Sequence, residues 1–414
     1  MRLVLVAILW IGCSSATRVR FDNHTLYRFT PKDDQAIDTL RQLEQSVGYD
    51  FWTSVNGVGM PVDILVPPQK KREIMEVVEA LAVDQEILMS NIQEEIDREA
   101  GSLRAGDTFG WNSYHTIEEI YNWLRSLSTK YPKIVTLVEA GRSHENRPVL
   151  GVKVSFGKAT GQRQAVWIDS NIHAREWISG AVNTYILNAL LTSTDRSIRN
   201  LAERHDWYIF PVLNPDGFHY TYTTNRMWRK TRTPYGLCVG ADPNRNWDYK
   251  WNQGGSSSIP CTETYAGPRA FSEACTASTS RYLGGIAKEL LVYVSFHSYS
   301  QMLLLPYGHT AQHLDNYNVT YPIAVEAANS LTKRYGTRYT VGNVAETIYV
   351  ATGSSMDWLK GVHHVPFAYT YELRDTGKYG FLLPADQIIP TAEETLDSVL
   401  TIVREADKIS EKVL

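Results

Sequence analysis

A histidine and a glutamate three residues apart form the first candidate metal site in the sequence. His173 and Glu176 stand in the segment His-Ala-Arg-Glu, directly after an apolar run that ends at Asp169. At a turn between a strand and a helix, both side chains can point at one ion and give it a nitrogen and a carboxylate ligand. His297 follows a second apolar run and can supply a third ligand. Such a set is typical of catalytic zinc, although His-x-x-Glu alone is more often a surface pair or a carboxylate at a helix N-terminus than a metal site.

Two later segments combine arginine and asparagine with tryptophan. Residues 225–232 include Arg229, and residues 242–248 include Asn244 and Arg245. The arginine fork meets a carboxylate with two parallel hydrogen bonds, so these segments favour a carboxylate-binding site. The alternatives are a solvated basic face or a nucleic-acid patch, and the formal net charge of −4 argues against the second.

A further carboxylate lies at the end of an apolar run. Glu372 follows the run 367–371, where a water-excluded cleft would let it act as the general base for a zinc-activated water. The alternative is an ion pair with Arg374.

The sequence contains no Gly-x-Gly-x-x-Gly, no phosphate-binding loop with Gly-Lys-Ser/Thr, no Gly-x-Ser-x-Gly and no His-Glu-x-x-His. Nucleotide, redox-cofactor and serine-hydrolase functions therefore lose most of their support.

The elements that position these residues are predicted from hydrophobic patterns. Helical patterns such as 181–191 lie between several apolar runs, and Thr116 to Glu119 forms a capping box for a helix through Leu127. This alternation predicts an α/β domain with a parallel or mixed sheet, whose ligand sites gather beyond the carboxyl ends of the strands. The predicted strands are 134–138, 149–154, 165–168, 207–213, 290–296 and 367–371.

A smaller domain is predicted before residue 91, in the order βαββαβ of a ferredoxin-like fold. The charged segment 91–104 after it is expected to be a linker open to a trypsin-like protease. The predicted strands are 25–30, 50–54, 62–66 and 87–90, and the predicted helices are 33–45 and 70–82.

Length and composition agree with two folded domains in a secreted chain. The 414 residues suit one large domain and a smaller one, and 43% hydrophobic with 21% charged residues is typical of globular proteins. Residues 1–16 combine Met1-Arg2, an apolar stretch and a small-residue end, which predicts a signal peptide. No later run approaches the ~20 apolar residues of a membrane span, so a soluble secreted protein is expected.

Three cysteines remain after the signal peptide leaves with Cys13. Cys238 and Cys261 are 23 residues apart across a Gly/Ser-rich stretch, and they are the best candidates for a disulfide in an oxidising compartment. Cys275 is expected to stay unpaired.

Taken together, these sequence segments resemble those of the A/B group of zinc metallocarboxypeptidases in proenzyme form. The resemblance covers nearly the whole chain. It implies a signal peptide over 1–16, an inhibitory pro-domain with its activation segment over 17–104, and a catalytic domain over 105–414 with a mixed eight-stranded sheet flanked by helices. It also implies one Zn²⁺ per chain, peptide or protein C-termini as substrates, and a monomer.

The resemblance assigns a role to each matching residue. His173, Glu176 and His297 match the zinc ligands. Glu372 matches the general base and acid. The residues that match substrate-contacting positions are Arg229 for the oxyanion, Asn244, Arg245 and the mobile Tyr349 for the terminal carboxylate, and Arg175 as an auxiliary arginine.

Met356 occupies the position that decides substrate choice in this family. An acidic residue there accompanies removal of Lys and Arg, and an apolar one accompanies removal of aliphatic and aromatic residues. Burying a cationic side chain against Met would cost several kcal/mol, so carboxypeptidase A-like specificity is expected. The alternatives are basic, carboxypeptidase B-like specificity, or a non-catalytic secreted relative that binds peptides.

Activation is expected to follow cleavage by a trypsin-like protease. Arg104 is favoured over Arg98 because Ala105-Gly-Asp-Thr resembles the start of the mature family enzymes.

Overall fold

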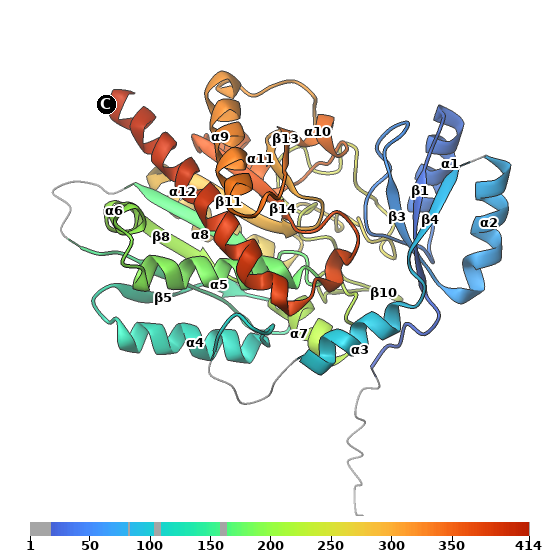
Figure 1. Cartoon of the computed structure of the whole chain (residues 1–414), viewed down its shortest axis with the longest axis horizontal. Helices are drawn as coiled ribbons and strands as arrows, with labels where there is room; N and C mark the ends of the chain where they lie inside the picture. The colour runs from blue at the N-terminus through green and yellow to red at the C-terminus, as the bar shows by residue number, and fades with distance from the viewer. Residues whose placement is uncertain (1–17, 82, 103–108, 158–163, 414) are drawn as a thin grey trace, which may run out of the picture.

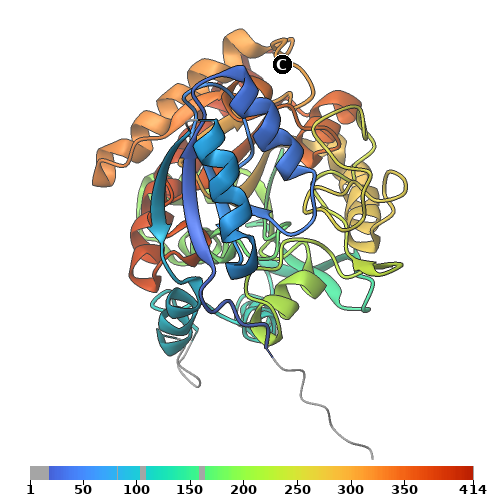
Figure 2. The same cartoon turned by 90° about the vertical axis from the view of Figure 1, so that its right-hand side faces the viewer.

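The computed structural model describes residues 18–81, 83–102, 109–157 and 164–413 of the chain. They form an N-terminal domain, residues 18–102, and a larger C-terminal domain, residues 109–413. Figure 1 shows the two side by side, and Figure 2 shows the N-terminal domain lying over the face of the larger one. The expected signal peptide and the candidate cleavage residue Arg104 lie outside the described residues.

The N-terminal domain confirms the predicted βαββαβ order. Its four-stranded sheet has the order β2-β3-β1-β4, and each pair of neighbouring strands is antiparallel. One face carries the core around Phe29, Ile64 and Val66, with Leu40 and Ile74 from the two helices. The elements are β1 (Thr25–Thr30), α1 (Asp34–Glu44), β2 (Asp50–Phe51), β3 (Val62–Val66), the 3₁₀ turn η1 (Pro68–Lys70), α2 (Lys71–Ala80) and β4 (Asp84–Met89).

The expected linker after this domain is instead helix α3 (Ile92–Ser102), so that prediction was wrong over most of its length. Ile92, Ile96 and Glu99 recur at helical spacing and form one stripe that faces the rest of the protein. Other charged residues of the segment, such as Glu94, Asp97 and Arg98, are exposed to solvent. Only residues 103–104 of the expected linker lie outside the described part.

The C-terminal domain is built on one mixed sheet of eight strands, as expected. Its order is β13-β12-β14-β11-β7-β8-β6-β5. The central run β14-β11-β7-β8 is parallel, so the carboxyl ends of these four strands meet at one edge. The strands are β5 (Val135–Arg142), β6 (Pro148–Val154), β7 (Ala165–Ser170), β8 (Asp206–Phe210), β11 (Leu290–Ser298), β12 (Met302–Leu305), β13 (Thr340–Asn343) and β14 (Phe367–Leu373).

Helices cover both faces of this sheet (Figure 1). On one face, α4, α5, α9 and α12 pack on alternate strand residues such as Ile168, Val294 and Tyr371. On the other, α8 and α11 pack around Trp167 and Tyr293. The helices are α4 (Ile117–Lys130, with the predicted capping box), α5 (Trp177–Thr192), α6 (Arg196–Arg204), α7 (Pro215–Thr223), α8 (Ala274–Ile286), α9 (Tyr317–Tyr335), α10 (Val344–Thr347), α11 (Ser355–His363) and α12 (Ile388–Val413).

Short elements complete the C-terminal domain. They are the strands β9 (Pro234–Tyr235) and β10 (Cys238–Val239) and the 3₁₀ turns η2 (Ala287–Glu289), η3 (Gly380–Leu382) and η4 (Ala385–Gln387). Among the helices of the described residues, none is both long and apolar enough to cross a bilayer.

Candidate active site

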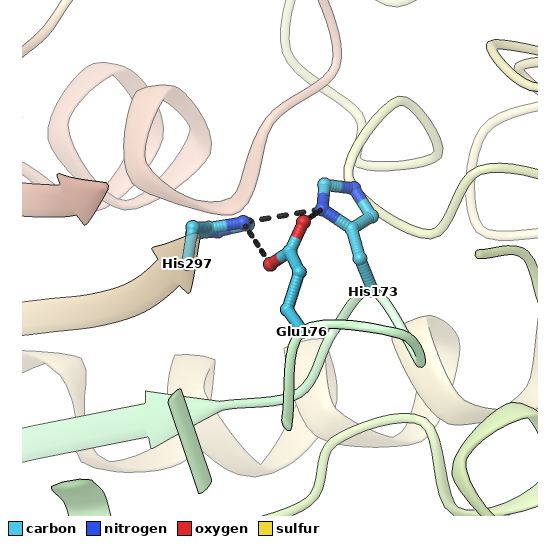
Figure 3. A group of neighbouring side chains, drawn as sticks. All are labelled: His173, Glu176 and His297. Atoms are coloured by element: carbon cyan, nitrogen blue, oxygen red, sulfur yellow. Dashed lines mark hydrogen bonds and ion pairs between the residues drawn. The ribbon is translucent and has the colours of Figure 1, made fainter. Parts of the chain in front are cut away.

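Two parallel strands bring the three expected metal ligands together. His173 and Glu176 follow the end of β7, while His297 is near the end of the adjacent strand β11. The Glu176 carboxylate lies between the two rings, with Oε1 2.8 Å from His173 Nδ1 and Oε2 3.1 Å from His297 Nδ1 (Figure 3). The two Nδ1 atoms are 3.2 Å apart. All three side chains are buried.

These atoms fit a zinc ion. Tetrahedral zinc with bonds of about 2.0–2.1 Å separates its ligand atoms by about 3.3–3.4 Å, close to the observed spacings. Asp242 Oδ1 lies 3.0 Å from Nε2 of His173, the nitrogen that faces away from the group. A carboxylate in this position orients a histidine ligand and fixes its tautomer. The sequence segment 242–248 was singled out for Asn244 and Arg245, and the role of its first residue, Asp242, was missed.

The protonation states of His173 and Glu176 suit metal binding. Burial together with the nearby Arg229 guanidinium lowers the pKa of His173, which keeps that imidazole neutral as a metal ligand must be. Burial alone would raise the pKa of Glu176. The adjacent His173 and His297 rings outweigh it, so the pKa lies well below its usual range and Glu176 is a carboxylate.

Arg229 lies beside the metal ligands and is held by the same aspartate. Its Nη2 donates to Asp242 Oδ2 at 2.8 Å, and its Nη1 is 3.7 Å from Glu176 Oε1. Asp242 therefore contacts both a metal ligand and this arginine, and the paired charges hold its pKa well below its ordinary value against the effect of burial. A fixed guanidinium at this point can meet negative charge that develops next to the metal.

The three residues expected to bind a terminal carboxylate are also brought together. The backbone N–H of Asn244 donates to Asp242 Oδ1 at 2.8 Å, and its side-chain Oδ1 accepts from the backbone N–H of Ser355 at 3.0 Å. This arrangement leaves the Asn244 amide N–H groups as the donors of that side chain. Arg245 Nη2 lies 2.6 Å from the Tyr349 hydroxyl, so the arginine and tyrosine act at one place.

Glu372 stands opposite His297 in the register between β14 and β11. Burial raises the pKa of its carboxyl to about 8. The alternative role expected from sequence, an ion pair with Arg374, is not formed, because Arg374 Nε donates to Glu394 on α12 at 2.7 Å. Glu372 instead lines a cavity of about 330 Å³ with His173, Glu176 and Arg229.

Met356 lies at the start of α11, between the residues expected to bind a terminal carboxylate and the strand of Glu372. It is 2% exposed, and its Sδ is 3.4 Å from Thr370 Oγ1, two residues before Glu372. The neighbouring Asp357 points elsewhere, since its carboxylate accepts the backbone N–H of Gly308 at 2.8 Å. The only acidic neighbour of Met356 in sequence is thus already engaged.

The N-terminal domain closes the cleft from outside. Arg175 Nη1 lies 2.8 Å from both carboxylate oxygens of Asp50, at the start of β2, and Arg175 is 1% exposed. Trp52 packs on Phe381 with ring centroids 4.9 Å apart. Sequence analysis did not find Asp50, because an isolated aspartate in a distant domain carries no pattern that points to its partner.

Two further ion-paired groups fasten the domains together. The Tyr299 hydroxyl donates to Asp63 Oδ2 at 2.7 Å, and Arg28 donates to both Asp63 and the carbonyl of Thr376. In α3, Glu99 forms a buried ion pair with Arg226. The residues contributed by the N-terminal domain therefore include three carboxylates that meet donors of the larger domain.

The predicted disulfide between Cys238 and Cys261 is present and closes a loop beside the cleft. Cys275 is free, as expected, and it is buried, which raises the pKa of its thiol.

Comparisons with known proteins agree with this geometry. The family model described as zinc carboxypeptidase matches residues 120–398, and the model described as carboxypeptidase activation peptide matches residues 27–99. The chain is 47% identical to zinc carboxypeptidase A 1 of Anopheles gambiae, over 97% of this chain and 94% of that protein. It is 38% identical to carboxypeptidase A1 of Bos taurus, over 92% and 94%.

Solved structures show the same fold. The crystal structure of the carboxypeptidase A from Helicoverpa armigera superposes with a TM-score of 0.87 at 28% identity, covering 94% of this chain and 99% of that one. The matches span both domains and include the segments that carry the three metal ligands. The chain therefore belongs to the zinc carboxypeptidase family, as a metallocarboxypeptidase made with its activation peptide.

Proposed function

We propose that this protein is a secreted proenzyme whose active form removes single hydrophobic residues, aliphatic or aromatic, from peptide C-termini. The observation that carries this proposal is the shared use of Asp242. Its Oδ1 contacts the metal ligand His173 and the backbone of Asn244, and its Oδ2 contacts Arg229. The metal group, the oxyanion-binding arginine and the carboxylate-binding residues are thus held at fixed distances from one another, as cleavage one residue from a chain end requires.

In this proposal each residue has one task at the scissile bond. Zinc, when bound, supplies a Lewis-acid charge at the reacting centre. Glu372 takes the proton of the attacking water and returns it to the leaving amine, and burial, which raises the pKa of this carboxyl, increases its affinity for that proton. Arg229 donates to the carbonyl oxygen as negative charge develops there.

Recognition of the chain end depends on donors that an internal peptide would leave unpaired. Arg245, Asn244 and Tyr349 meet the terminal carboxylate, with Arg175 as an auxiliary donor. A substrate that lacks this carboxylate would bury these donors without partners. Buried donors left unpaired typically lower the specificity constant for such an analogue strongly.

Met356 supports a preference for hydrophobic residues. Its buried thioether presents an apolar, adaptable surface, and Asp357 is engaged by Gly308. A Lys or Arg side chain would find no free carboxylate on these two residues. Basic specificity is the competing outcome.

The contacts of the N-terminal domain support inhibition before activation, because the Asp50 carboxylate occupies the Arg175 guanidinium.

Cleavage after Arg104 is favoured over cleavage after Arg98. The Arg98 side chain is exposed, but the next residue, Glu99, is buried in α3 against Arg226, so a protease would have to unwind this helix. N-terminal sequencing of the trypsin-treated protein tests this, and a start at Glu99 instead of Ala105 would contradict it.

The test of the whole proposal uses the zinc-loaded protein collected from the medium of secreting cells. After trypsin, it is assayed on acylated dipeptides that end in Phe or Arg, with and without a chelator. Chelator-sensitive release of Phe alone supports the proposal. Release of Arg instead would keep the chemistry and overturn the role of Met356, whereas zinc binding without release of either residue would indicate a non-catalytic peptide-binding protein. Retention of the chain inside the cells would contradict secretion.

A further inference from the structure

A buried serine and aspartate lie behind His297, on the side of the ring that faces away from the metal-binding atoms. Ser295 and Asp169 face each other in the register between β11 and β7. Ser295 Oγ is 2.6 Å from Asp169 Oδ1 and 3.3 Å from His297 Nε2. Ser295 and Asp169 are both 0% exposed. None of the steps proposed for the reaction uses either side chain.

The direction of the hydrogen bonds in this group follows from its donors. Trp167 Nε1 can only donate, and it does so to Asp169 Oδ2 at 2.8 Å. The other carboxylate oxygen accepts the Ser295 hydroxyl proton, so a lone pair of that hydroxyl faces His297. The ring must then carry its proton on Nε2, which leaves the lone pair of Nδ1 directed toward Glu176 and His173.

We propose that Ser295 and Asp169 are positioning residues that hold His297 in the tautomer and orientation that bind zinc through Nδ1. His173 is held by the carboxylate of Asp242 directly, whereas His297 is held through a hydroxyl interposed between ring and carboxylate. The two histidine ligands thus have different supports, and the second one depends on a neutral side chain.

Loss of such a support typically costs about 10–100-fold in metal affinity. Ser295→Ala removes the hydroxyl and leaves His297 Nε2 and one oxygen of Asp169 without this partner. Asp169→Asn keeps the shape, but only one of its two terminal atoms can accept, so it cannot take both the Trp167 and the Ser295 protons. Both variants should therefore weaken zinc binding by about 10–100-fold, whereas Ser295→Thr retains the hydroxyl and should recover most of the affinity.

The matched control is Ser398→Ala. Ser398 on α12 is also 0% exposed, and its hydroxyl is 2.7 Å from the Tyr371 hydroxyl, on the opposite face of the sheet. The Ser398→Ala variant therefore loses a hydrogen bond that is as buried as that of Ser295, and the lost hydroxyl does not contact the metal ligands. Its zinc affinity should stay within about twofold of the parent protein.

The measurement is the dissociation constant for Zn²⁺ of the uncleaved proenzyme, determined by competition with a chelator of known affinity. The melting temperatures of the metal-free variants are recorded beside it, to measure purely structural damage. The inference stands if Ser295→Ala and Asp169→Asn lose zinc affinity while Ser398→Ala, with a comparable drop in metal-free melting temperature, does not. It is overturned if Ser295→Ala binds zinc as tightly as Ser398→Ala, or if Ser295→Thr binds as weakly as Ser295→Ala. Because zinc binding is read directly, failure of the proposed substrate preference would leave this test unaffected.

Discussion

The ion pair between Asp50 and Arg175 should hold the proenzyme in its inactive form. Both carboxylate oxygens of Asp50 lie 2.8 Å from Arg175 Nη1, and the two side chains are 24% and 1% exposed. Hydrogen bonds to charged groups in such settings contribute about 1.5–3 kcal/mol. Asp50→Ala should reduce the free energy of docking of the N-terminal domain by about this amount. Because 1.4 kcal/mol is a factor of ten, the undocked fraction should rise by about 10–150-fold.

The assay compares hydrolysis of an acylated dipeptide ending in Phe before and after trypsin treatment of the same preparation. Activity before cleavage measures the undocked fraction, and activity after cleavage normalises it. Asp84→Ala is the control. It removes an aspartate of the same domain whose partner, Lys32, also belongs to that domain and whose side chain is 69% exposed. Such surface pairs contribute about 0–1 kcal/mol, and this one does not touch the larger domain.

Two outcomes would refute the reasoning. Equal activity of Asp50→Ala and Asp84→Ala before cleavage would show that the remaining contacts, such as Asp63 with Tyr299, hold the domain without Asp50. Unequal activity after complete cleavage would show that the substitution impairs folding of the proenzyme, since Asp50 itself should no longer be part of the active enzyme.

Three further predictions concern the catalytic domain. Met356→Asp should shift the activated enzyme toward C-terminal Arg and lower kcat/KM for Phe by at least about 100-fold, because the buried carboxylate needs a cationic partner. The control Met356→Leu should keep the preference for Phe. An unchanged ratio of kcat/KM for Phe and Arg in Met356→Asp would contradict the assignment of Met356 to the side-chain pocket. Glu372→Gln should lower kcat by about 10²–10⁴-fold while zinc affinity, measured by chelator competition, is retained; near-normal kcat would exclude Glu372 as the general base. Because burial raises the pKa of Cys275, its thiol should stay protonated in the folded protein at pH 8.5, and the stability that this thiol contributes should be full below the ordinary thiol pKa of about 8.5 and fall as pH rises beyond it. An alkylating reagent should then label Cys275 only after denaturation, and rapid labelling of the native protein would show that the site opens.

Much of the fold follows from local patterns in the sequence. The alternation of apolar runs located every strand of the parallel centre, and a capping box located the start of α4, because periodicity and capping are properties of a few consecutive residues. The resemblance to a family supplied the number of strands in the mixed sheet and fixed the set of three metal ligands that the residues had suggested, whereas the order of the strands was seen only in the structure. Spacing alone left His-x-x-Glu open to a surface pair.

The contacts that sequence analysis missed join distant segments. Asp50 and Arg175 are 125 positions apart, and nothing near either residue points to the other. An ion pair with Arg374 was the alternative role considered for Glu372, but α12 supplies Glu394 as the partner of Arg374, and only the packed structure places it there. The α3 helix is a different case. Its stripe of Ile92, Ile96 and Glu99 is a local signal that the high charge of the segment obscured.

The register that pairs His297 with Glu372 has a consequence for how new specificities could arise in this scaffold. Neighbouring strands lie about 4.8 Å apart, so the hydrogen-bond ladder of the sheet sets the gap between the metal ligand His297 and Glu372, the proposed general base. Met356 and Tyr349, in contrast, belong to a helix start and a loop outside the sheet. In the proposed function, reaction chemistry and substrate choice are therefore assigned to separate parts of the fold. A library that varies only residues 349–356 should yield enzymes with altered preference and an unaltered chemical step, which makes this segment the natural target for directed evolution.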